Sequence, residues 1–138
     1  MNNSERITYM NGDFIPESEA KVHFRDRSFK YGDGVFDMTR TFGHKIFKIE
    51  EHVERLYKSL NYLDIALDLT PKEMIDISND VLQRNLHLIK EDEDYWVGQR
   101  ISRGVDRVGG EQWDLEGGPT VIVECAPLPL KPRASLYE

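Results

Sequence analysis

Two helical patterns that follow one another in the middle of the chain constrain the fold most. The first begins near Glu50 and repeats apolar residues at helical spacing, namely Val53, Leu56, Tyr57, Leu60 and Leu63. The second opens with the capping box Thr70-Pro71-Lys72-Glu73, with proline at the first helical position, and ends near Asn85. Strand-like segments lie before and after this pair. The sequence therefore predicts an α+β domain and not alternating βαβ units.

The strand-like segments combine apolar residues with flanking turn residues. We expect strands at 6–10, 14–15, 21–24, 35–42, 46–48, 95–102 and 119–125. The pair Asn11-Gly12 is a strong hairpin signal, because both residues tolerate positive φ. Between the last two strands, 104–118 is rich in glycine and is expected to be a structureless loop, of a length that is usually functional or mobile.

Composition excludes several classes of function. The chain has 18 Lys+Arg against 25 Asp+Glu, a net charge of −7, which disfavours broad nucleic-acid binding and attraction to an anionic membrane. No apolar run is long enough to span a bilayer. Cys125 is the single cysteine, so no internal disulfide can form and a reducing cytoplasm is the simplest location. The histidines lack metal-ligand spacing, and we expect no metal site among them; they are His23, His44, His52 and His87.

Arginines are the most informative charged residues. Arg40, Arg100 and Arg103 are assigned to predicted strands, and Arg107 to the long loop. An arginine that faces a core needs an anion or a carboxylate beside it, so such a cluster would suit a phosphate or a substrate carboxylate. The alternative is that these arginines lie on the solvent face of the strands. Arg55 falls away from the apolar stripe of its helix, and amphipathicity alone predicts a solvated side chain.

Two further features bear on a site and on domain organisation. Tyr31 and Phe36 surround a GxG turn and either line an apolar pocket or belong to the core. Three of the six prolines fall in the final stretch 126–138, a composition typical of stiff connectors. We therefore expect a domain at 1–126 and an interdomain connector at 127–138, in a chain that is a fragment or one piece of a larger assembly.

The segment RDRSFKYGDGVFDMTRTFGHKIFKIEEHVERL resembles the class IV, or fold-type IV, aminotransferases, which use pyridoxal 5'-phosphate (PLP). YGDGVF, EEHVERL about 20 residues later and a following SRG strand form a specific combination. The likeness covers essentially this whole chain but only the first half of a family member. It implies an antiparallel sheet packed with two helices, the small N-terminal domain of a two-domain enzyme with its cofactor between the domains.

The resemblance also assigns residues. The arginine of the EHxxRL motif binds the cofactor phosphate in the family, and here it is Arg55, which replaces the local prediction of a merely solvated side chain. The lysine that carries the cofactor belongs to the second domain, so no catalytic residue is expected in this chain. Tyr31, Phe36, Arg40 and Arg100 match substrate-pocket positions of the branched-chain branch. Part of that pocket is contributed across the dimer interface in the family, which implies a homodimer.

The implied activity is transamination from an amino acid or amine to a 2-oxo acid, with a branched-chain-like substrate, completed by a C-terminal domain or second chain. Arg107 is a near match to an arginine of the D-amino acid branch, but the histidine that accompanies it there is missing. FDMTRTF also differs from the FEGIR typical of branched-chain enzymes, which leaves D-amino acid or (R)-amine substrates open. The sequence is also compatible with an aminodeoxychorismate lyase-like enzyme, which would release pyruvate, and with a non-catalytic anion-binding domain.

Overall fold

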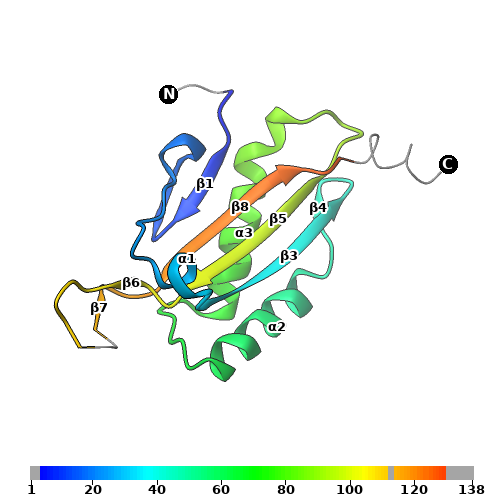
Figure 1. Ribbon diagram of the computed structural model, residues 1–138. Coiled ribbons are helices and arrows are strands. Elements are labelled where there is room, and N and C mark those ends of the chain that lie inside the picture. The colour runs from blue at the N-terminus through cyan, green and yellow to red at the C-terminus, as the bar shows by residue number, and fades with distance from the viewer. Residues whose placement is uncertain (1–3, 112–113, 130–138) are drawn as a thin grey trace.

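The computed structural model describes residues 4–111 and 114–129, which form an antiparallel sheet with two long helices on one face (Figure 1). The six strands of the sheet follow the order β2-β1-β8-β5-β3-β4. Their bounds are β1 Ile7–Met10, β2 Asp13–Pro16, β3 Gly34–Phe42, β4 Lys45–Ile46, β5 Tyr95–Ser102 and β8 Thr120–Pro127. A separate two-stranded ribbon pairs β6 Val105–Asp106 with β7 Leu115–Glu116.

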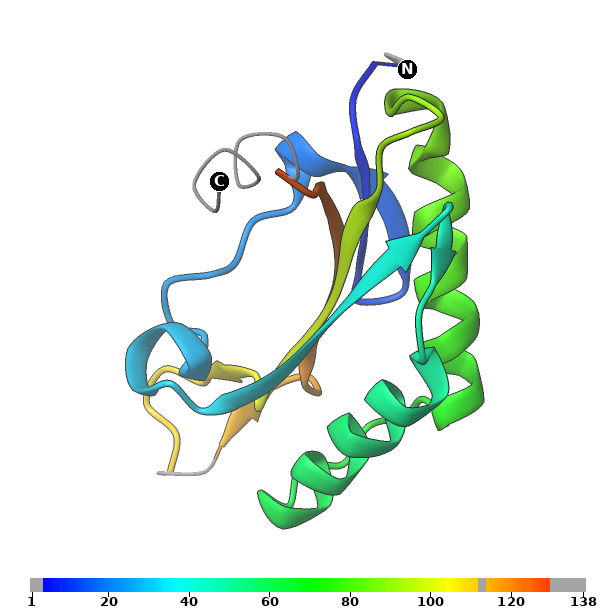
Figure 2. The same ribbon diagram turned by 90° about the vertical axis from the view of Figure 1, so that its right-hand side faces the viewer.

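The two long helices, α2 Ile49–Tyr62 and α3 Pro71–Asn85, cover the same face of the sheet (Figure 2). The predicted capping box is present at the start of α3, where the Thr70 side chain accepts from the Glu73 backbone N–H and the Glu73 side chain accepts from that of Thr70. A short helix, α1 Arg27–Tyr31, lies on the other side of the sheet. Two 3-10 turns, η1 Glu17–Glu19 and η2 Leu86–Leu88, complete the described elements. The expected α+β architecture is confirmed. None of the helices in the described ranges is both long and apolar enough to cross a membrane.

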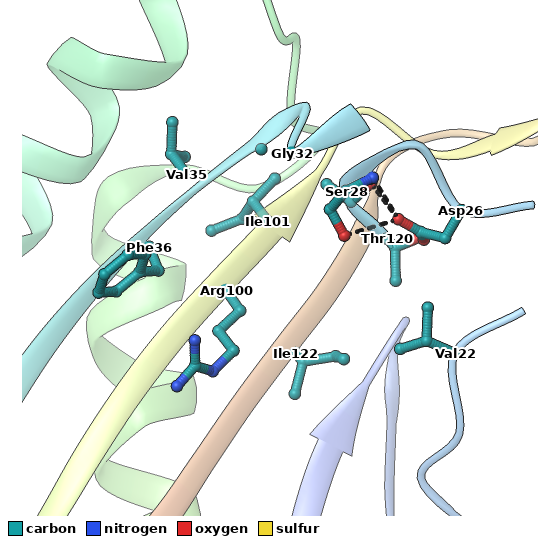
Figure 3. A pocket seen from close by; sticks show the side chains of 12 residues that line it. Val22, Asp26, Ser28, Gly32, Val35, Phe36, Arg100, Ile101, Thr120 and Ile122 are labelled. Atoms are coloured by element: carbon teal, nitrogen blue, oxygen red, sulfur yellow. Dashed lines mark hydrogen bonds between the residues drawn. The ribbon is translucent and has the colours of Figure 1, made fainter. Parts of the chain in front are cut away.

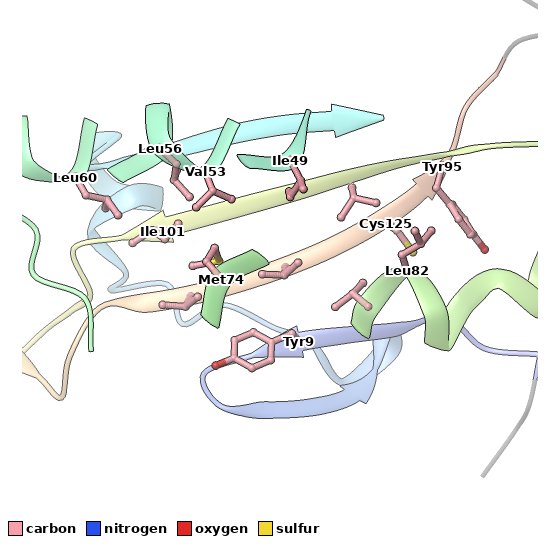
Figure 4. Close-up of a cluster of buried hydrophobic side chains, with 14 of the residues drawn as sticks. Tyr9, Ile49, Val53, Leu56, Leu60, Met74, Leu82, Tyr95, Ile101 and Cys125 are labelled. Atoms are coloured by element: carbon pink, nitrogen blue, oxygen red, sulfur yellow. The ribbon is translucent and has the colours of Figure 1, made fainter. Parts of the chain in front are cut away.

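The hydrophobic core lies between the sheet and the two long helices (Figure 4). Each side contributes residues that are at least nine-tenths buried: Val53, Leu56 and Leu60 of α2, Met74, Val81 and Leu82 of α3, and Val97, Ile101, Val121, Val123 and Cys125 of the strands. These are the positions that helical spacing and strand alternation place on one face. The pattern of apolar residues thus determines which face of each long helix packs against the sheet.

Several predicted boundaries hold and others are wrong. Asn11 and Gly12 have φ of 50° and 103° and connect β1 to β2 in the predicted hairpin. The predicted strand at 21–24 is absent, because Val22 and Phe24 are 45% and 61% exposed in a segment that joins no sheet. The loop 104–118 is not structureless, since β6 and β7 pair within it.

The short helix α1 was not predicted. It begins after Asp26, whose side chain accepts a hydrogen bond from the Ser28 backbone N–H at 2.9 Å, and ends at Gly32 with a left-handed φ of 68°. These are ordinary helix caps, but five residues are too few to show an apolar period. Of the predicted connector 127–138, residues 130–138 lie outside the described residues.

Asp26 joins α1 to two strands of the sheet. Its carboxylate is fully buried and accepts from the Ser28 backbone and hydroxyl, from the Ser102 hydroxyl of β5 and, at 2.6 Å, from the Thr120 hydroxyl of β8. Burial raises the pKa of Asp26, but the hydrogen bonds from Ser102, Thr120 and Ser28 outweigh it and hold the pKa below its ordinary value. The ionised carboxylate therefore stabilises the folded state.

Asn85 ties the last turn of α3 to the start of β1. Its Oδ1 accepts from the Ile7 backbone N–H at 2.8 Å, and its Nδ2 donates to the Ile7 carbonyl at 2.9 Å and to the Val81 carbonyl at 2.7 Å. The amide thus satisfies both backbone groups of a residue at the start of β1. The Tyr95 hydroxyl donates to the Asn85 carbonyl at 2.7 Å, which fastens the same turn to β5.

Asn85→Ala is expected to lower the free energy of unfolding by about 2–3 kcal/mol, because it leaves partly buried backbone groups of Ile7 without these partners. Urea unfolding followed by circular dichroism measures the change. Asn79→Ala is the matched control, since this amide is exposed and makes a single bond to the Ile75 carbonyl on the same helix. Equal losses in the two variants would contradict the role given to Asn85.

The acid sensitivity of folding is expected to depend on Asp26. Because its pKa in the folded state lies below that of the unfolded chain, its stabilisation is present above about pH 4 and is lost as the pH falls through the folded value. Asp26→Asn should therefore be less stable at pH 7 and should lose less further stability on acidification. Chemical unfolding between pH 7 and pH 3 checks this, and an unchanged pH slope in the variant would argue against it.

Candidate functional site

A buried carboxylate on β3 holds the arginine that the family resemblance singled out. Arg55 of α2 donates from Nε to Asp37 Oδ2 and from Nη2 to Asp37 Oδ1, both at 2.8 Å. His52 lies one helical turn earlier on the same side of α2, and its Nδ1 is 2.6 Å from Asp37 Oδ1. The three side chains form a compact cluster between the helix and the sheet.

The two ends of this ion pair have opposite environments. The Asp37 side chain is 4% exposed, whereas that of Arg55 is 65% exposed. Burial raises the pKa of Asp37, but hydrogen bonds and charge from Arg55 and His52 outweigh it and lower the pKa, so the carboxylate is ionised at neutral pH. The same carboxylate raises the pKa of Arg55.

Arg55 remains able to bind a further anion. A guanidinium has five N–H groups, and Asp37 takes two of them. Arg55 also borders a groove of about 390 Å³ together with Val35, Lys58, Ser59, Tyr62 and Leu63. A fixed guanidinium with unused donors beside an open groove fits a phosphate group such as that of PLP.

A cavity of about 350 Å³ lies at the opposite face of the sheet (Figure 3). Phe36 and Arg100 face each other across the β3–β5 pairing and both line it. Val22 and Ile122 add apolar side chains to it, while Val35 and Ile101 border it although their side chains face the helices. Arg100 donates from Nε to Glu124 Oε2 at 2.8 Å, and its guanidinium carbon lies 5.5 Å from the Phe36 ring centre.

Tyr31 and Arg107 lie together in a different, more polar cavity of about 480 Å³. The Tyr31 ring lies under Arg27, whose guanidinium carbon is 4.9 Å from the ring centre. Arg27 in turn pairs with Asp33 at 2.8 Å and with Asp106 at 3.0 Å, which links α1 to the β6–β7 ribbon. Arg107 is exposed; its guanidinium donates a long hydrogen bond of 3.4 Å to the Leu115 carbonyl, and its backbone N–H donates to the Asp114 carbonyl at 3.0 Å.

Arg40 is not brought together with the other predicted pocket residues. It pairs with Trp96 near the far end of β3, its guanidinium carbon lies 3.7 Å from the Phe42 ring centre, and its Nε donates to the Thr41 carbonyl at 3.0 Å. It lines neither of the two cavities that contain Phe36 and Tyr31. The predicted residues therefore fall into separate groups in this chain.

Met38 occupies the sheet surface between Phe36 and Arg40. A Cβ atom on Gly98, its partner in β5, would lie 2.9 Å from Met38 Cε and 3.1 Å from Met38 Sδ. The methionine thus lies directly over the glycine. This packing occurs at one of the positions where FDMTRTF departs from FEGIR.

Sequence reasoning missed Asp37, although a signal was present. Strand alternation in β3 places Val35, Asp37 and Thr39 on one face, and Asp37 and Thr39 are buried. A carboxylate at a buried position requires a cationic or hydrogen-bonding partner. That partner is Arg55 on the following helix. The helical wheel alone predicts that its side chain is solvated.

Comparison with known proteins gives this geometry a family context. The family model "Amino-transferase class IV" matches residues 34–134. A protein of Methanocaldococcus jannaschii named "Putative branched-chain-amino-acid aminotransferase" is 36% identical over 121 residues, which is 88% of this chain and 40% of that protein. The D-alanine aminotransferase of Staphylococcus haemolyticus is 36% identical over 77 residues, 56% of this chain and 27% of that protein.

Solved structures agree on the fold. The branched-chain aminotransferase of Thermoproteus uzoniensis, solved with norvaline, superposes with a TM-score of 0.75 at 20% identity, over 90% of this chain and 41% of that one. A PLP-bound "hypothetical aminotransferase" of Mycobacterium tuberculosis superposes with a TM-score of 0.76 at 20% identity, over 96% and 43%.

The chain thus spans about 40% of the length of the first of these relatives. The family match extends over most of the chain, from the YGDGVF turn through the Arg55 helix to the terminal strand. On this evidence the chain belongs to the class IV aminotransferases.

Proposed function

We propose that residues 1–126 form the small N-terminal domain of a PLP-dependent aminotransferase, with 127–138 as the connector to a second domain or chain. The observation that carries the proposal is Arg55, a guanidinium fixed by a buried carboxylate yet 65% exposed beside a groove. The lysines in the described ranges are all exposed, which suits a cofactor-bearing lysine in another part of the protein.

In this proposal Arg55 donates hydrogen bonds to the cofactor phosphate and thereby orients the cofactor. When bound, PLP supplies the electron sink that allows a proton to leave the carbon bearing the amino group. The group that moves this proton is assigned to the second domain. The residues of this domain hold the phosphate, bind the substrate and form part of the wall that excludes water.

Substrate recognition is assigned to the cavities on the other side of the sheet. Phe36 and Arg100 form walls of the apolar cavity, while Tyr31 and Arg107 lie in the polar one, where Arg107 can receive a carboxylate. In this chain Arg40 stacks on Phe42, away from both cavities. We therefore propose a substrate-binding role for Arg40 only in the assembled protein. Phe36 and Tyr31 are 66% and 61% exposed, which supports a pocket completed by another subunit in a homodimer.

A branched-chain-like donor is favoured among the possible substrates. The relative with a branched-chain name covers 88% of this chain, against 56% for the D-alanine enzyme, and Val22, Phe36 and Ile122 give one cavity an apolar lining. A cytoplasmic location belongs to the same proposal. It accords with Cys125, a free thiol whose pKa is raised by burial to about 12.

Arg55→Ala in the complete gene product is expected to weaken PLP binding by about 10- to 100-fold, the range for loss of hydrogen bonds to a charged group. Equilibrium dialysis with PLP, read by its absorbance, measures this. Lys58→Ala is the matched control, because Lys58 borders the same groove but pairs with Glu54 on the helix surface. Retention of full PLP affinity by Arg55→Ala would overturn the assignment.

The complete protein is expected to transfer the amino group of L-leucine, L-isoleucine or L-valine to 2-oxoglutarate, measured as glutamate formed. A lyase activity needs no amino acceptor, so the second assay supplies 4-amino-4-deoxychorismate alone and measures pyruvate. Pyruvate release without glutamate formation would favour the lyase. D-alanine as a third donor tests for a D-amino acid aminotransferase.

A further inference from the structure

We infer that Asp37, braced by His52, is a positioning residue that presents Arg55 to the cofactor phosphate. The inference rests on the proposed function of Arg55 as the phosphate anchor. It adds a role for two side chains that do not reach the phosphate themselves. The cluster, and not Arg55 alone, would then determine how strongly the phosphate is held.

The first step of the argument is the geometry of the ion pair. Asp37 binds the Nε and Nη2 edge of Arg55 in a bidentate manner, with both distances at 2.8 Å. Bidentate pairing fixes the plane of a guanidinium as well as its position. Nη2 also lies 3.3 Å from His52 Nδ1, whereas the Nη1 group lies outside these contacts, so one edge of the guanidinium is held while Nη1 stays available.

The second step is the rigidity of the carboxylate. Asp37 sits within the regular β3–β5 ladder opposite Gln99, and its side chain is 4% exposed. His52 Nδ1 lies 2.6 Å from the same Oδ1 atom that receives Arg55 Nη2. A strand position, burial and a second hydrogen-bond partner all restrict rotation of the carboxylate, which therefore acts as a fixed support.

The third step concerns what Arg55 would be without this support. Arginine has a long side chain with high rotamer entropy, and the Arg55 side chain is 65% exposed to solvent. An exposed arginine that is free to move must lose that freedom when it binds an anion. Asp37 removes the freedom in advance, and its negative charge is directed at the edge of the guanidinium that the phosphate does not use.

The consequence can be measured as phosphate discrimination, the ratio of the dissociation constant of pyridoxal to that of PLP in the complete gene product. Asp37→Ala is expected to lower this ratio about three- to tenfold, the range for immobilising one flexible side chain. Arg55→Ala should lower it further. In the Arg55→Ala background, Asp37→Ala should cause no additional loss, because a positioning residue acts on the phosphate through Arg55.

Two controls separate positioning from general destabilisation. Asp94 also binds β3, through the Thr41 hydroxyl, but four residues further along the strand. Asp94→Ala is expected to lower the melting temperature without changing the discrimination ratio. Asp37→Asn keeps the shape of the side chain but removes its charge. It replaces Asp37→Ala in the experiment if that variant does not fold. Like Asp37→Ala, it is expected to lower the discrimination ratio.

The outcomes distinguish this inference from the proposal on which it rests. If Arg55→Ala leaves the ratio unchanged, the phosphate-anchor proposal fails, and the role of Asp37 fails with it. If Arg55→Ala lowers the ratio but Asp37→Ala and Asp37→Asn do not, the anchor stands and the positioning role is wrong. An equal loss from Asp37→Ala with and without Arg55 would also refute positioning, since it would show an effect independent of the guanidinium.

Discussion

The pairing of β3 with β5 is the constraint on which the candidate site depends. Seven residue pairs fix the register from Gly34–Ser102 to Arg40–Trp96. Because side chains alternate along a strand, this register sends Asp37 toward the helices and Phe36 toward the open face. A slip by one residue would exchange the two faces and would separate Asp37 from Arg55 and Phe36 from Arg100.

The two faces therefore have different chemistry on one strand. On the helix side, Asp37 and Thr39 are buried polar residues with specific partners, the Arg55–His52 pair and the Val97 carbonyl. On the other side, Phe36 is exposed and lies near Arg100, and Met38 is half-buried. Burial makes the loss of Arg55 costly for Asp37, because a buried carboxylate needs hydrogen-bonding partners to stay ionised.

Much of the fold could be predicted because its signals are local. The Asn11-Gly12 turn, the capping box before α3 and the apolar stripe of α2 each specify a backbone conformation within a few residues. The errors arose where tertiary contacts decide. The segment 21–24 alternates like a strand but finds no partner, and α1 is fixed by a buried carboxylate bonded to two distant strands.

The candidate site was harder to predict than the fold. The helical wheel placed Arg55 in solvent, which is correct for most of its surface, but the wheel contains no information on the strand opposite. The family resemblance supplied the phosphate role, which stays a proposal, and the structure added Asp37 and His52. Arg40 shows the limit of motif transfer, since its neighbours in this chain are Thr41 and Phe42 and not the cavity residues.

The packing of Met38 over Gly98 couples two positions on the open face of the sheet. A Cβ atom at position 98 would lie 2.9 Å from Met38 Cε, so the flexible end of the methionine would have to turn aside to accept a larger residue there. A substitution at Gly98 would therefore move the Met38 side chain, and the relief of the sheet surface between Phe36 and Arg40 would change with it.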